Sequence, residues 1–542
     1  MENINFPEKV FGPAEYLPEK IYALPEVISY PYKLNLADFL VGRSAAKYKD
    51  KTAIYFRNDK ISYGELWVSV NRLANGFRSL GLGEFDRVML MSPNRPEWLI
   101  GFMACWKIGA IPVLANHVIK KDEIIHRVTD SVVSAVVCSE SCLDEIEKAD
   151  FPFLKKIVID GKADAPNCVS FSELMKNQSD TARSAPTTLD HIGRIIYSSG
   201  TTGKPKGIIS TVRDILSCTD THGRYVLKVN EDDILGGHPY FSFAFGSVNF
   251  TFHPWRFGAS VSIIERFSPE EMFRTIREHG VTMLFCVPTA LNMMLNLADP
   301  HIEDMKTVRL CQSAGEPLNT KTYREWKSRY NVEILDSLGS GDLMYWLSTF
   351  EGMPEEKIGS LGSNVPGVEN KIVGEDFNEL PRGEQGELLV RGPFGQIYWK
   401  NSEKQKQAVI NGWNRPGLYM YQDKDGYFWY LSRIDDIIVT SGYKIPGGEV
   451  ENAINGHHAV LESAVVPSPD PVRGSVIKAY VVLRDGFQPC QELEDELRSF
   501  VKGKIEDYKY PRLIEFAKAE DLPRTTTGKI QRNVLRDKEN RQ

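Results

Sequence analysis

Residues 197–207, YSSGTTGKPKG, combine glycines, hydroxyl side chains and lysines in a loop that is suited to holding phosphate groups. The preceding residues 192–196, apolar except for Gly193 and Arg194, predict a strand that ends at this loop. Glycines let the backbone approach a phosphate closely, free N–H groups and hydroxyls donate hydrogen bonds, and lysines supply positive charge. The stretch lacks the Gly-Lys-Ser/Thr ending of a Walker A motif. Two interpretations of this stretch are therefore open: a phosphate-binding loop and a flexible surface loop.

The length and composition of the chain bound its architecture. At 542 residues it is too long for one compact core, so two or more domains are expected. It is 42% hydrophobic and 25% charged, as soluble globular proteins are, and its net charge of −7 argues against a general nucleic-acid binder. The 8 cysteines are scattered without a CxxC pair, which predicts reduced, mostly buried thiols rather than disulfides or a zinc site.

No segment of the sequence predicts secretion or a membrane span. The start, MENINFPEKV, lacks the basic residues and apolar core of a secretory signal. The most apolar stretch, residues 98–115, is interrupted by Lys107 and two glycines, so we expect a buried helix followed by a strand. These features predict a cytoplasmic protein without a membrane span.

Helical and strand-like segments alternate along most of the chain. Within residues 52–115, Ser62 and Glu65 fit a capping box, apolar residues then recur at helical spacing as far as Gly81, and a strand is expected over 87–92. The further strand-like runs are 157–159, 281–287, 308–310 and 332–335. Such alternation predicts an α/β protein with sheets flanked by helices.

The pattern changes near residue 434. A short helix is expected over 448–454 and a strand over 476–483. The next helix carries one apolar face, formed by Leu493, Leu497, Phe500, Val501 and Ile505. These segments predict a small α+β domain of about 100 residues, a normal domain size. We therefore expect an N-terminal domain over 1–434 and a C-terminal domain over 435–542.

Several motifs in fixed order resemble those of the adenylate-forming superfamily, which comprises acyl- and aryl-CoA ligases, adenylation domains of peptide synthetases, and luciferases. Besides the loop at 197–207 they are SAGEPL at 313–318, DSLGSGD at 336–342, RGEQGELLVRGP at 382–393, SRIDDIIVTSGYKIPGGEVE at 432–451, YKYPRLIEF at 508–516 and LPRTTTGKIQR at 522–532. The last segments, with the N-terminal YALPEVISYPYKLNLADFL, are most similar to the benzoate, aminobenzoate and medium-chain acyl-CoA ligase branch. The resemblance implies a large N-terminal domain of two α/β sheets and a small β-barrel, followed by a small mobile C-terminal domain.

The resemblance also implies a reaction in two halves. A carboxylate attacks the α-phosphate of ATP, which gives an acyl-adenylate and pyrophosphate, and the thiol of coenzyme A then displaces AMP. Adenylation supplies the good leaving group that a free carboxylate lacks, and such chemistry relies on positioning and on neutralising charge. ATP, Mg²⁺ and coenzyme A are the implied cofactor and co-substrates.

Matching positions carry the implied roles. Lys529 would reach the carboxylate and phosphate oxygens during adenylation, unless it is a solvated surface lysine. Arg433 would contact the ribose hydroxyls, or else pair with Asp435, the implied hinge residue. Gly442 would line the pantetheine tunnel or be an ordinary loop glycine. The other positions implied to bind nucleotide are Thr201, Thr202, Gly203, Lys206, Ala314, Gly315, Glu316, Leu338 and Gly339.

The acyl pocket is expected between two aromatic-rich segments. HPYFSFAFGSV at 238–248 aligns with the family segment that supplies the pocket wall, and FCVPTA at 285–290 is expected beside it. An aromatic run is also compatible with plain core. The candidate lining residues are Tyr240, Phe241, Phe245, Gly246 and Pro288. No cationic side chain obviously awaits a second charge, which favours a hydrophobic monocarboxylate, aromatic or medium-chain.

Three positions depart from the family pattern at the nucleotide and metal site. The usual Thr-Glu pair is Gly341-Asp342 here, so the hydroxyl is lost while a shorter carboxylate remains for Mg²⁺. The usual ribose-binding aspartate is replaced by Leu418, which accepts no hydrogen bond. We expect catalysis to survive these changes.

Three functions remain open on this basis. The first is an aryl- or medium-chain acyl-CoA ligase, and the second is a stand-alone adenylation enzyme that loads a carrier-protein thiol. The third is a degenerate ligase that only binds an acyl-adenylate or coenzyme A. Gly341, Asp342 and Leu418 favour it, and the intact Lys529, Arg433 and phosphate loop disfavour it. The expected partners are small molecules and no nucleic acid, and the resemblance is compatible with a homodimer.

Overall fold

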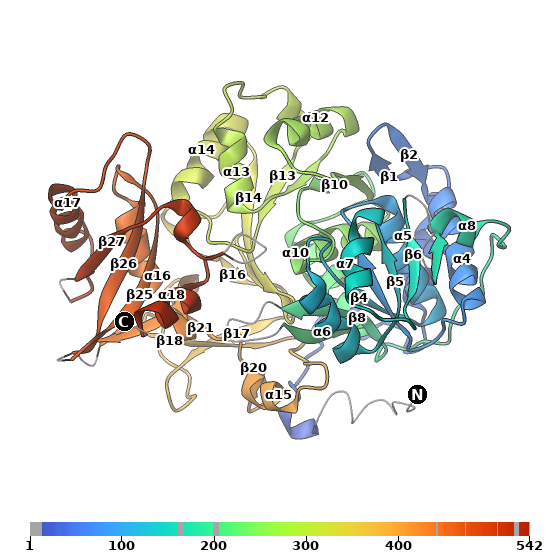
Figure 1. Cartoon of the computed structure of the whole chain (residues 1–542), viewed down its shortest axis with the longest axis horizontal. Coiled ribbons are helices and arrows are strands. Elements are labelled where there is room, and N and C mark those ends of the chain that lie inside the picture. The colour runs from blue at the N-terminus through green and yellow to red at the C-terminus, as the bar shows by residue number, and fades with distance from the viewer. Residues whose placement is uncertain are drawn as a thin grey trace. The chain divides into compact units, whose positions relative to one another are not determined.

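The chain folds into two compact units. The computed structural model describes residues 13–160, 167–198, 205–440, 443–471, 473–506, 508–524 and 530–540. The first unit lies within residues 1–198, 204–370 and 390–414, and the second within 371–389 and 415–542 (Figure 1). Helices and sheets occur in both, so the fold is mixed α/β, as expected. The boundary at residue 435 stays a prediction.

The first unit contains a seven-stranded sheet in the order β7-β6-β5-β3-β4-β8-β9. All its neighbours are parallel except β8 and β9, which pair antiparallel on either side of residues 199–205. Parallel strands buried on both faces read as the near-continuous apolar runs seen here. The strands are β3 (Arg87–Met91), β4 (Ile111–Leu114), β5 (Val133–Cys138), β6 (Lys155–Val158), β7 (Cys168–Ser170), β8 (Ile192–Ser198) and β9 (Lys206–Thr211).

A nine-stranded sheet in the same unit has the order β16-β15-β14-β13-β12-β10-β11-β1-β2. Its middle is parallel, and β2, β15 and β16 add antiparallel edges. The strands are β1 (Thr52–Phe56), β2 (Asp59–Ser62), β10 (Ile234–Gly237), β11 (Ser260–Ile263), β12 (Met283–Phe285), β13 (Leu310–Ser313), β14 (Glu333–Ser340), β15 (Met344–Ser348) and β16 (Ser363–Asn364).

Two helices form a layer between the sheets. α4 (Tyr63–Ser79) contacts β1 and β2, α5 (Pro96–Ile108) contacts β3 and β4, and the two helices pack on each other. The predicted capping box is present, because Ser62 and Glu65 exchange hydrogen bonds at the start of α4. The other α-helices of at least seven residues in the described parts of this unit are α6 (Lys121–Ser131), α9 (Val212–Cys218), α10 (Ala244–Thr251), α12 (Pro269–His279), α13 (Pro288–Leu295), α14 (Thr320–Tyr330) and α15 (Ser402–Ala408).

The second unit begins with antiparallel strands and ends with an α+β fold. Strand β21 pairs with β18 and β22, and β25-β26-β27 form a three-stranded sheet whose core includes helices α16 and α17. The elements are β17 (Glu369–Val373), β18 (Gln385–Arg391), β21 (Leu418–Gln422), β22 (Phe428–Arg433), β23 (Ile437–Thr440), β24 (Tyr443–Pro446), α16 (Gly447–Asn455), β25 (Val460–Asp470), β26 (Gly474–Leu483), α17 (Gln491–Lys502), β27 (Leu513–Phe516) and α18 (Arg532–Glu539).

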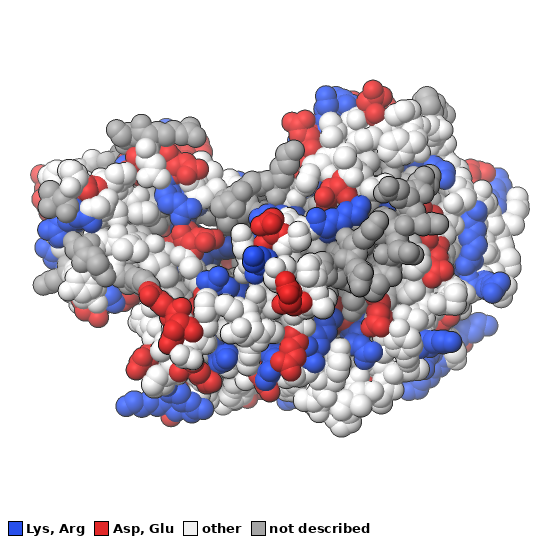
Figure 2. All heavy atoms as spheres, turned by 90° about the horizontal axis from the view of Figure 1, so that it is seen from below, with Lys and Arg blue, Asp and Glu red and all other residues white. Residues whose placement is uncertain are grey.

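Two predicted segments differ from the structure in position. The run 308–310 is mostly a connection, because a 3-10 turn over Asp304–Thr307 precedes it and β13 begins at Leu310. Ile505 lies beyond the end of α17, although it still packs on the same core. Within the described parts of the chain, no helix is both long and apolar enough to cross a membrane. Acidic and basic side chains are interspersed over the face shown in Figure 2.

Candidate functional site

The ends of the candidate phosphate loop are firmly held. Ser198 closes β8 opposite Lys206, which opens β9, and Thr201, Thr202 and Gly203 lie outside the described residues. Next to the loop, the hydroxyl of Tyr197 donates to Asp130 at 2.6 Å, and burial together with that carboxylate raises its pKa. Lys206 is half-exposed and has no ion-pair partner among the described residues. Its charge is therefore available to a ligand.

A second segment runs along β9. The amide of Ile209 donates to Ile397 at 2.9 Å, and the amide of Trp399 donates to Gly207 at 2.8 Å. Gly207 leaves little room at this contact, because a β-carbon there would lie 3.0 Å from the β-carbon of Trp399. Residues 397–399 therefore run beside β9, the strand that follows the candidate phosphate loop.

Asp342, the candidate metal ligand, is held by this same segment. Its Oδ2 accepts hydrogen bonds from Gln396 Nε2 at 2.6 Å and from the Tyr398 hydroxyl at 3.1 Å, and its Oδ1 accepts from Ser340. All three donors are neutral, and no lysine, arginine or histidine of the described chain forms an ion pair with it. A half-buried carboxylate without a cation among the described residues, whose Oδ1 accepts one hydrogen bond and keeps a lone pair, fits a hard ion such as Mg²⁺.

The hairpin that carries Asp342 lies against the strand that leads to the phosphate loop. A β-carbon on Gly341 would meet Ile196 of β8 at 3.3 Å. Gly339 has still less room, because its β-carbon would lie 2.4 Å from the carbonyl oxygen of Met344 across the hairpin. Only glycine permits that approach. The two sheets of the first unit thus meet between β8, which leads to the loop, and the hairpin that carries Asp342.

The expected adenine-side residues follow the carboxyl end of β13, beside the end of β12. Ala314 is buried, and Gly315 has a φ of +88°, a left-handed conformation that favours glycine. The carboxylate of Glu316 accepts hydrogen bonds from the amide of Thr289 at 3.3 Å and from its hydroxyl at 2.8 Å. Thr289 follows Pro288, the buried first residue of α13, so the two segments are joined. Crevices at the carboxyl ends of parallel strands are common ligand sites.

The candidate acyl-pocket segment is braced at its start by a side chain absent from our sequence prediction. Asn94 donates to the carbonyl of Pro239 at 3.1 Å and accepts from the amide of Phe241 at 2.9 Å. Phe241 is packed against Trp98 and Phe250 and is 2% exposed, so its ring belongs to the core.

Tyr240 and Phe245 are partly exposed and therefore remain candidates for the pocket lining. The ring of Phe245 lies 6.3 Å from that of Phe285. Gly246 admits no side chain, because a β-carbon would lie 2.1 Å from the carbonyl oxygen of Tyr240. That close approach fixes how the segment turns into α10.

Arg433 and the expected hinge residue lie in the second unit. Arg433 Nη2 is 3.8 Å from Asp435 Oδ2, and both side chains are exposed, so the alternative of a surface ion pair is present in the structure. Leu418 lies directly opposite Arg433 in the β21–β22 ladder. Gly442 and Lys529 lie outside the described residues, and the bridge between Arg524 and Ile530 spans the segment that contains the lysine.

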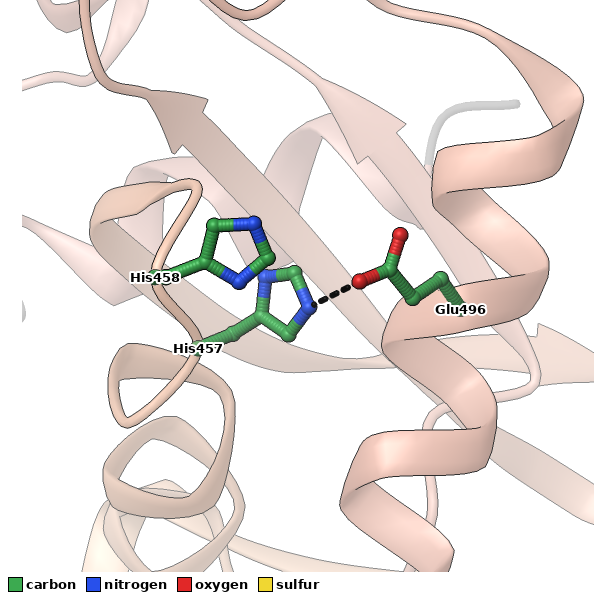
Figure 3. A group of neighbouring side chains, drawn as sticks. All are labelled: His457, His458 and Glu496. Carbon is green, nitrogen blue, oxygen red and sulfur yellow. Dashed lines mark hydrogen bonds and ion pairs between the residues drawn. The ribbon is translucent and has the colours of Figure 1, made fainter.

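Two histidines and a glutamate of the second unit offer ligand atoms within 4.8 Å of one another. Figure 3 shows His457 pointing at Glu496 of α17 beside His458. His457 Nε2 hydrogen-bonds to Glu496 at 3.0 Å, and its Nδ1 accepts from the amide of Ala459 at 3.3 Å. Both ring nitrogens of His457 are therefore occupied, and the group ties a turn to a helix.

The chain is similar to known protein families and to proteins of known structure. Residues 41–399 match the family described as AMP-binding enzyme, and 449–529 match the AMP-binding enzyme C-terminal domain. A benzoate–CoA ligase of Thauera aromatica is 33% identical over 520 residues, covering 94% of this chain and 97% of that protein. The mitochondrial acyl-coenzyme A synthetase ACSM3 of Homo sapiens is 32% identical over 493 residues, covering 88% and 83%. The structure of an anthranilate CoA ligase in complex with anthranoyl-AMP has a TM-score of 0.87 at 30% identity, covering 95% and 98%.

Proposed function

We propose that this chain, which belongs to the family of AMP-binding enzymes, adenylates a hydrophobic monocarboxylate with ATP and transfers the acyl group to coenzyme A. As a member of that family it is an acid–thiol ligase. The acid is proposed to be an aryl acid of the benzoate type or a medium-chain acid, in line with the names of two relatives.

One observation carries the proposal. Asp342 has no cationic partner among the described residues and accepts hydrogen bonds from Gln396 and Tyr398, and residues 397–399 in turn bond to β9 immediately after the phosphate loop. Lys206, at the foot of that loop, likewise lacks an ion-pair partner among the described residues. A carboxylate for a metal and a cation for phosphate are thus linked through residues 396–399, which supports the pairing that an ATP–metal complex requires.

The residues divide the proposed work as follows. Lys206, with Thr201, Thr202 and Gly203, would hold the pyrophosphate oxygens. Asp342 would hold Mg²⁺, which supplies charge neutralisation on the phosphates when bound. Lys529 would stabilise the negative charge that develops as the carboxylate attacks the α-phosphate. Hydrogen bonds from Gln396 and Tyr398 orient the carboxylate of Asp342 before any ligand arrives.

Pyrophosphate release with ATP, Mg²⁺ and coenzyme A tests the proposal. The acids should run from benzoate and substituted benzoates through cyclohexane carboxylate to C4–C12 fatty acids. We expect release with one class of acid and formation of its CoA thioester. Lys529→Ala should lower the rate of release by about 10²–10³-fold. Lys518→Ala, an exposed lysine of the same unit, should leave it unchanged.

Other outcomes would point to the other functions. Pyrophosphate release without thioester formation, restored by a carrier-protein thiol, would favour the stand-alone adenylation enzyme. The absence of release with every acid, combined with binding of an acyl-adenylate mimic, would favour the binding protein. Gly341 and Leu418 are the observations behind the binding-protein alternative, because neither side chain offers a hydrogen bond where the family pattern has one.

A further inference from the structure

A cluster of buried polar side chains lies next to the candidate acyl-pocket segment, to which Asn249 is hydrogen-bonded at Phe245. Every member is at most 3% exposed, and they come from six elements of the first unit, including the π-helix Thr219–Val226 and the short helix His253–Phe257. The buried polar cluster consists of His222, Asn249, His253, Gln312, Ser337 and Tyr345. Interiors usually hold apolar groups at such depth, so each polar group needs a hydrogen-bonding partner.

Tyr345 is the centre of the cluster. Its ring stacks on that of His222, with centroids 3.9 Å apart and planes at 19°. Its hydroxyl accepts hydrogen bonds from the side-chain amides of Asn249, at 2.9 Å, and Gln312. The imidazole of His222 continues the network to Gln312 at 3.1 Å and to His253 at 3.3 Å.

The histidines of the cluster are uncharged. Burial lowers the pKa of His222 well below its ordinary value and lowers that of His253 to about 3. Both imidazoles are therefore neutral at pH 7. The cluster as a whole offers hydrogen bonds without a net charge of its own.

Three buried polar atoms of this cluster have no hydrogen-bond partner among the residues that the structure describes. They are Asn249 Oδ1, Gln312 Oε1 and His253 Nδ1. The orientation of the Asn249 amide is fixed, because its Nδ2 donates to the carbonyl of Phe245 at 2.9 Å and turning it over would place two oxygens in contact. An unmet hydrogen-bond acceptor therefore lies next to Phe245, a candidate residue of the acyl pocket.

A buried cation stands beside the cluster. Arg194 is 0% exposed, its nitrogens donate hydrogen bonds to Ser210, Ser247 and the sulfur of Met344, and its guanidinium lies 4.9 Å from the ring centroid of Phe252. No carboxylate of the described chain bonds to it, and burial lowers its pKa to about 10, so it stays protonated at pH 7. Ser247 lies on α10 with Asn249, and Met344 adjoins Tyr345. A positively charged ligand group would be repelled here.

We propose that the buried polar cluster forms the inner end of the acyl pocket and selects an aromatic acid that carries a neutral hydrogen-bond donor, a hydroxyl or aryl amino group, which donates to Asn249 Oδ1. The inference rests on the proposed ligase function and narrows its substrate. Asn249 Oδ1, the unmet acceptor whose orientation is fixed, calls for a donor and disfavours a second acceptor such as a methoxy oxygen, and the buried charge of Arg194 disfavours an alkylammonium group. A pocket built to hydrogen-bond a substituent discriminates strongly against analogues that lack it.

The test compares acids of similar size in the wild-type enzyme. The kcat/KM for pyrophosphate release is measured with 2-, 3- and 4-substituted benzoates that carry hydroxyl, amino, methyl or methoxy groups, and with benzoate. At one ring position, we expect the hydroxy or amino acid to exceed its methyl and methoxy analogues by at least about tenfold. Equal values at every position would overturn the inference and indicate that buried water meets the unpaired oxygens.

Two variants locate the acceptor. Asn249→Leu should bring the ratio of donor-bearing to methyl-substituted acid close to one, whereas damage to the fold alone would lower both rates and leave the ratio high. Thr251→Val, a buried and nearly isosteric change on the same helix, should preserve the ratio. A ratio that stays high in Asn249→Leu would overturn the assignment.

If Asn249→Leu does not fold, the wild-type series still decides. Pyrophosphate release with benzoate but without discrimination would leave the proposed function standing and sink only this inference. No release with any acid would instead overturn the proposed function itself, so the two failures are distinguishable.

Discussion

Leu418 and Arg433 are direct partners in the antiparallel ladder of β21 and β22. Side chains at such positions lie on the same face of the sheet, with β-carbons about 4.5–5.5 Å apart. Arg433 is exposed, and its ion pair with Asp435 is long, at 3.8 Å. The proposed ribose-binding arginine thus faces an apolar side chain at the position where the family pattern has a carboxylate.

We expect Leu418→Asp to lower the KM for ATP, because a carboxylate at this position could accept hydrogen bonds from the ribose hydroxyls. Hydrogen bonds to a charged group contribute roughly 1.5–3 kcal/mol, so the decrease should be about tenfold to a hundredfold. Steady-state kinetics at a saturating concentration of acid measure it. Leu418→Asn is the uncharged control and should give a smaller decrease. An ATP KM that Leu418→Asp does not change would remove Leu418 and Arg433 from the nucleotide site.

Gln396 should control the response to Mg²⁺ through Asp342. Gln396→Leu removes the 2.6 Å hydrogen bond to the carboxylate and frees it to turn. Loss of such a supporting partner typically costs 10–100-fold in metal affinity, so the Mg²⁺ concentration for half-maximal activity should rise by about that factor. Tyr398→Phe removes the longer bond and should have a smaller effect.

Asp342→Asn tests the carboxylate itself. It keeps an oxygen acceptor and loses the charge, so activity should require far more Mg²⁺ than in the wild type. Gln491→Leu, at the start of α17 in the second unit, serves as the control and should titrate like the wild type. If Asp342→Asn shows the wild-type Mg²⁺ curve, the metal ligand lies elsewhere.

Asp336 should make the stability of the protein depend on pH. Burial raises the pKa of its carboxyl from the ordinary value of 3.8 to about 7, so the folded protein binds this proton more tightly than the unfolded chain. The contribution to stability is complete below about pH 4 and is lost as the pH rises through about 7. Asp336→Asn should remove this loss and stabilise the protein at pH 8. We expect roughly 1–3 kcal/mol, a value kept below that of the full pKa shift because part of the residue is exposed.

Thermal melts of wild type and Asp336→Asn at pH 5 and pH 8 measure this difference. The gap between the two melting temperatures should widen in favour of the variant at pH 8. Asp232→Asn, a change at an exposed carboxylate, should give the same gap at both pH values. A gap for Asp336→Asn that is equal at both pH values would show that Asp336 is solvated.

Local patterns in the sequence were sufficient to predict helices, because a helix forms its backbone hydrogen bonds within its own segment and buries one face. The capping box at Ser62 and the buried helix after Trp98 are confirmed because both signals are local. Strand β25 was not predicted, since Pro467 and Pro469 argue against a strand. It lies at the edge of its sheet, where a strand can do without the missing N–H groups of proline.

The candidate site was predictable only where short motifs carry it. The loop before Lys206 and the hairpin with Asp342 have recognisable residues, but their proximity depends on the meeting of two sheets. Gln396 and Tyr398 carry no motif, and the segment that contains them reaches Asp342 only because it runs beside β9. The buried polar cluster is likewise assembled from six elements, and none of them carries a sequence motif that predicts it.

Strand β8 has a consequence for how this enzyme could change its substrate. Arg194, at the edge of the buried polar cluster, and Ser198, at the start of the phosphate loop, are four residues apart on one strand, about 13 Å at 3.3 Å per residue. Arg194 and Ile196 share the face that meets Met344 and Gly341. A substitution at position 194 that adapts the pocket to a new acid would therefore also disturb the strand that leads to the phosphate loop. Selectivity for the acid and turnover should prove difficult to optimise independently.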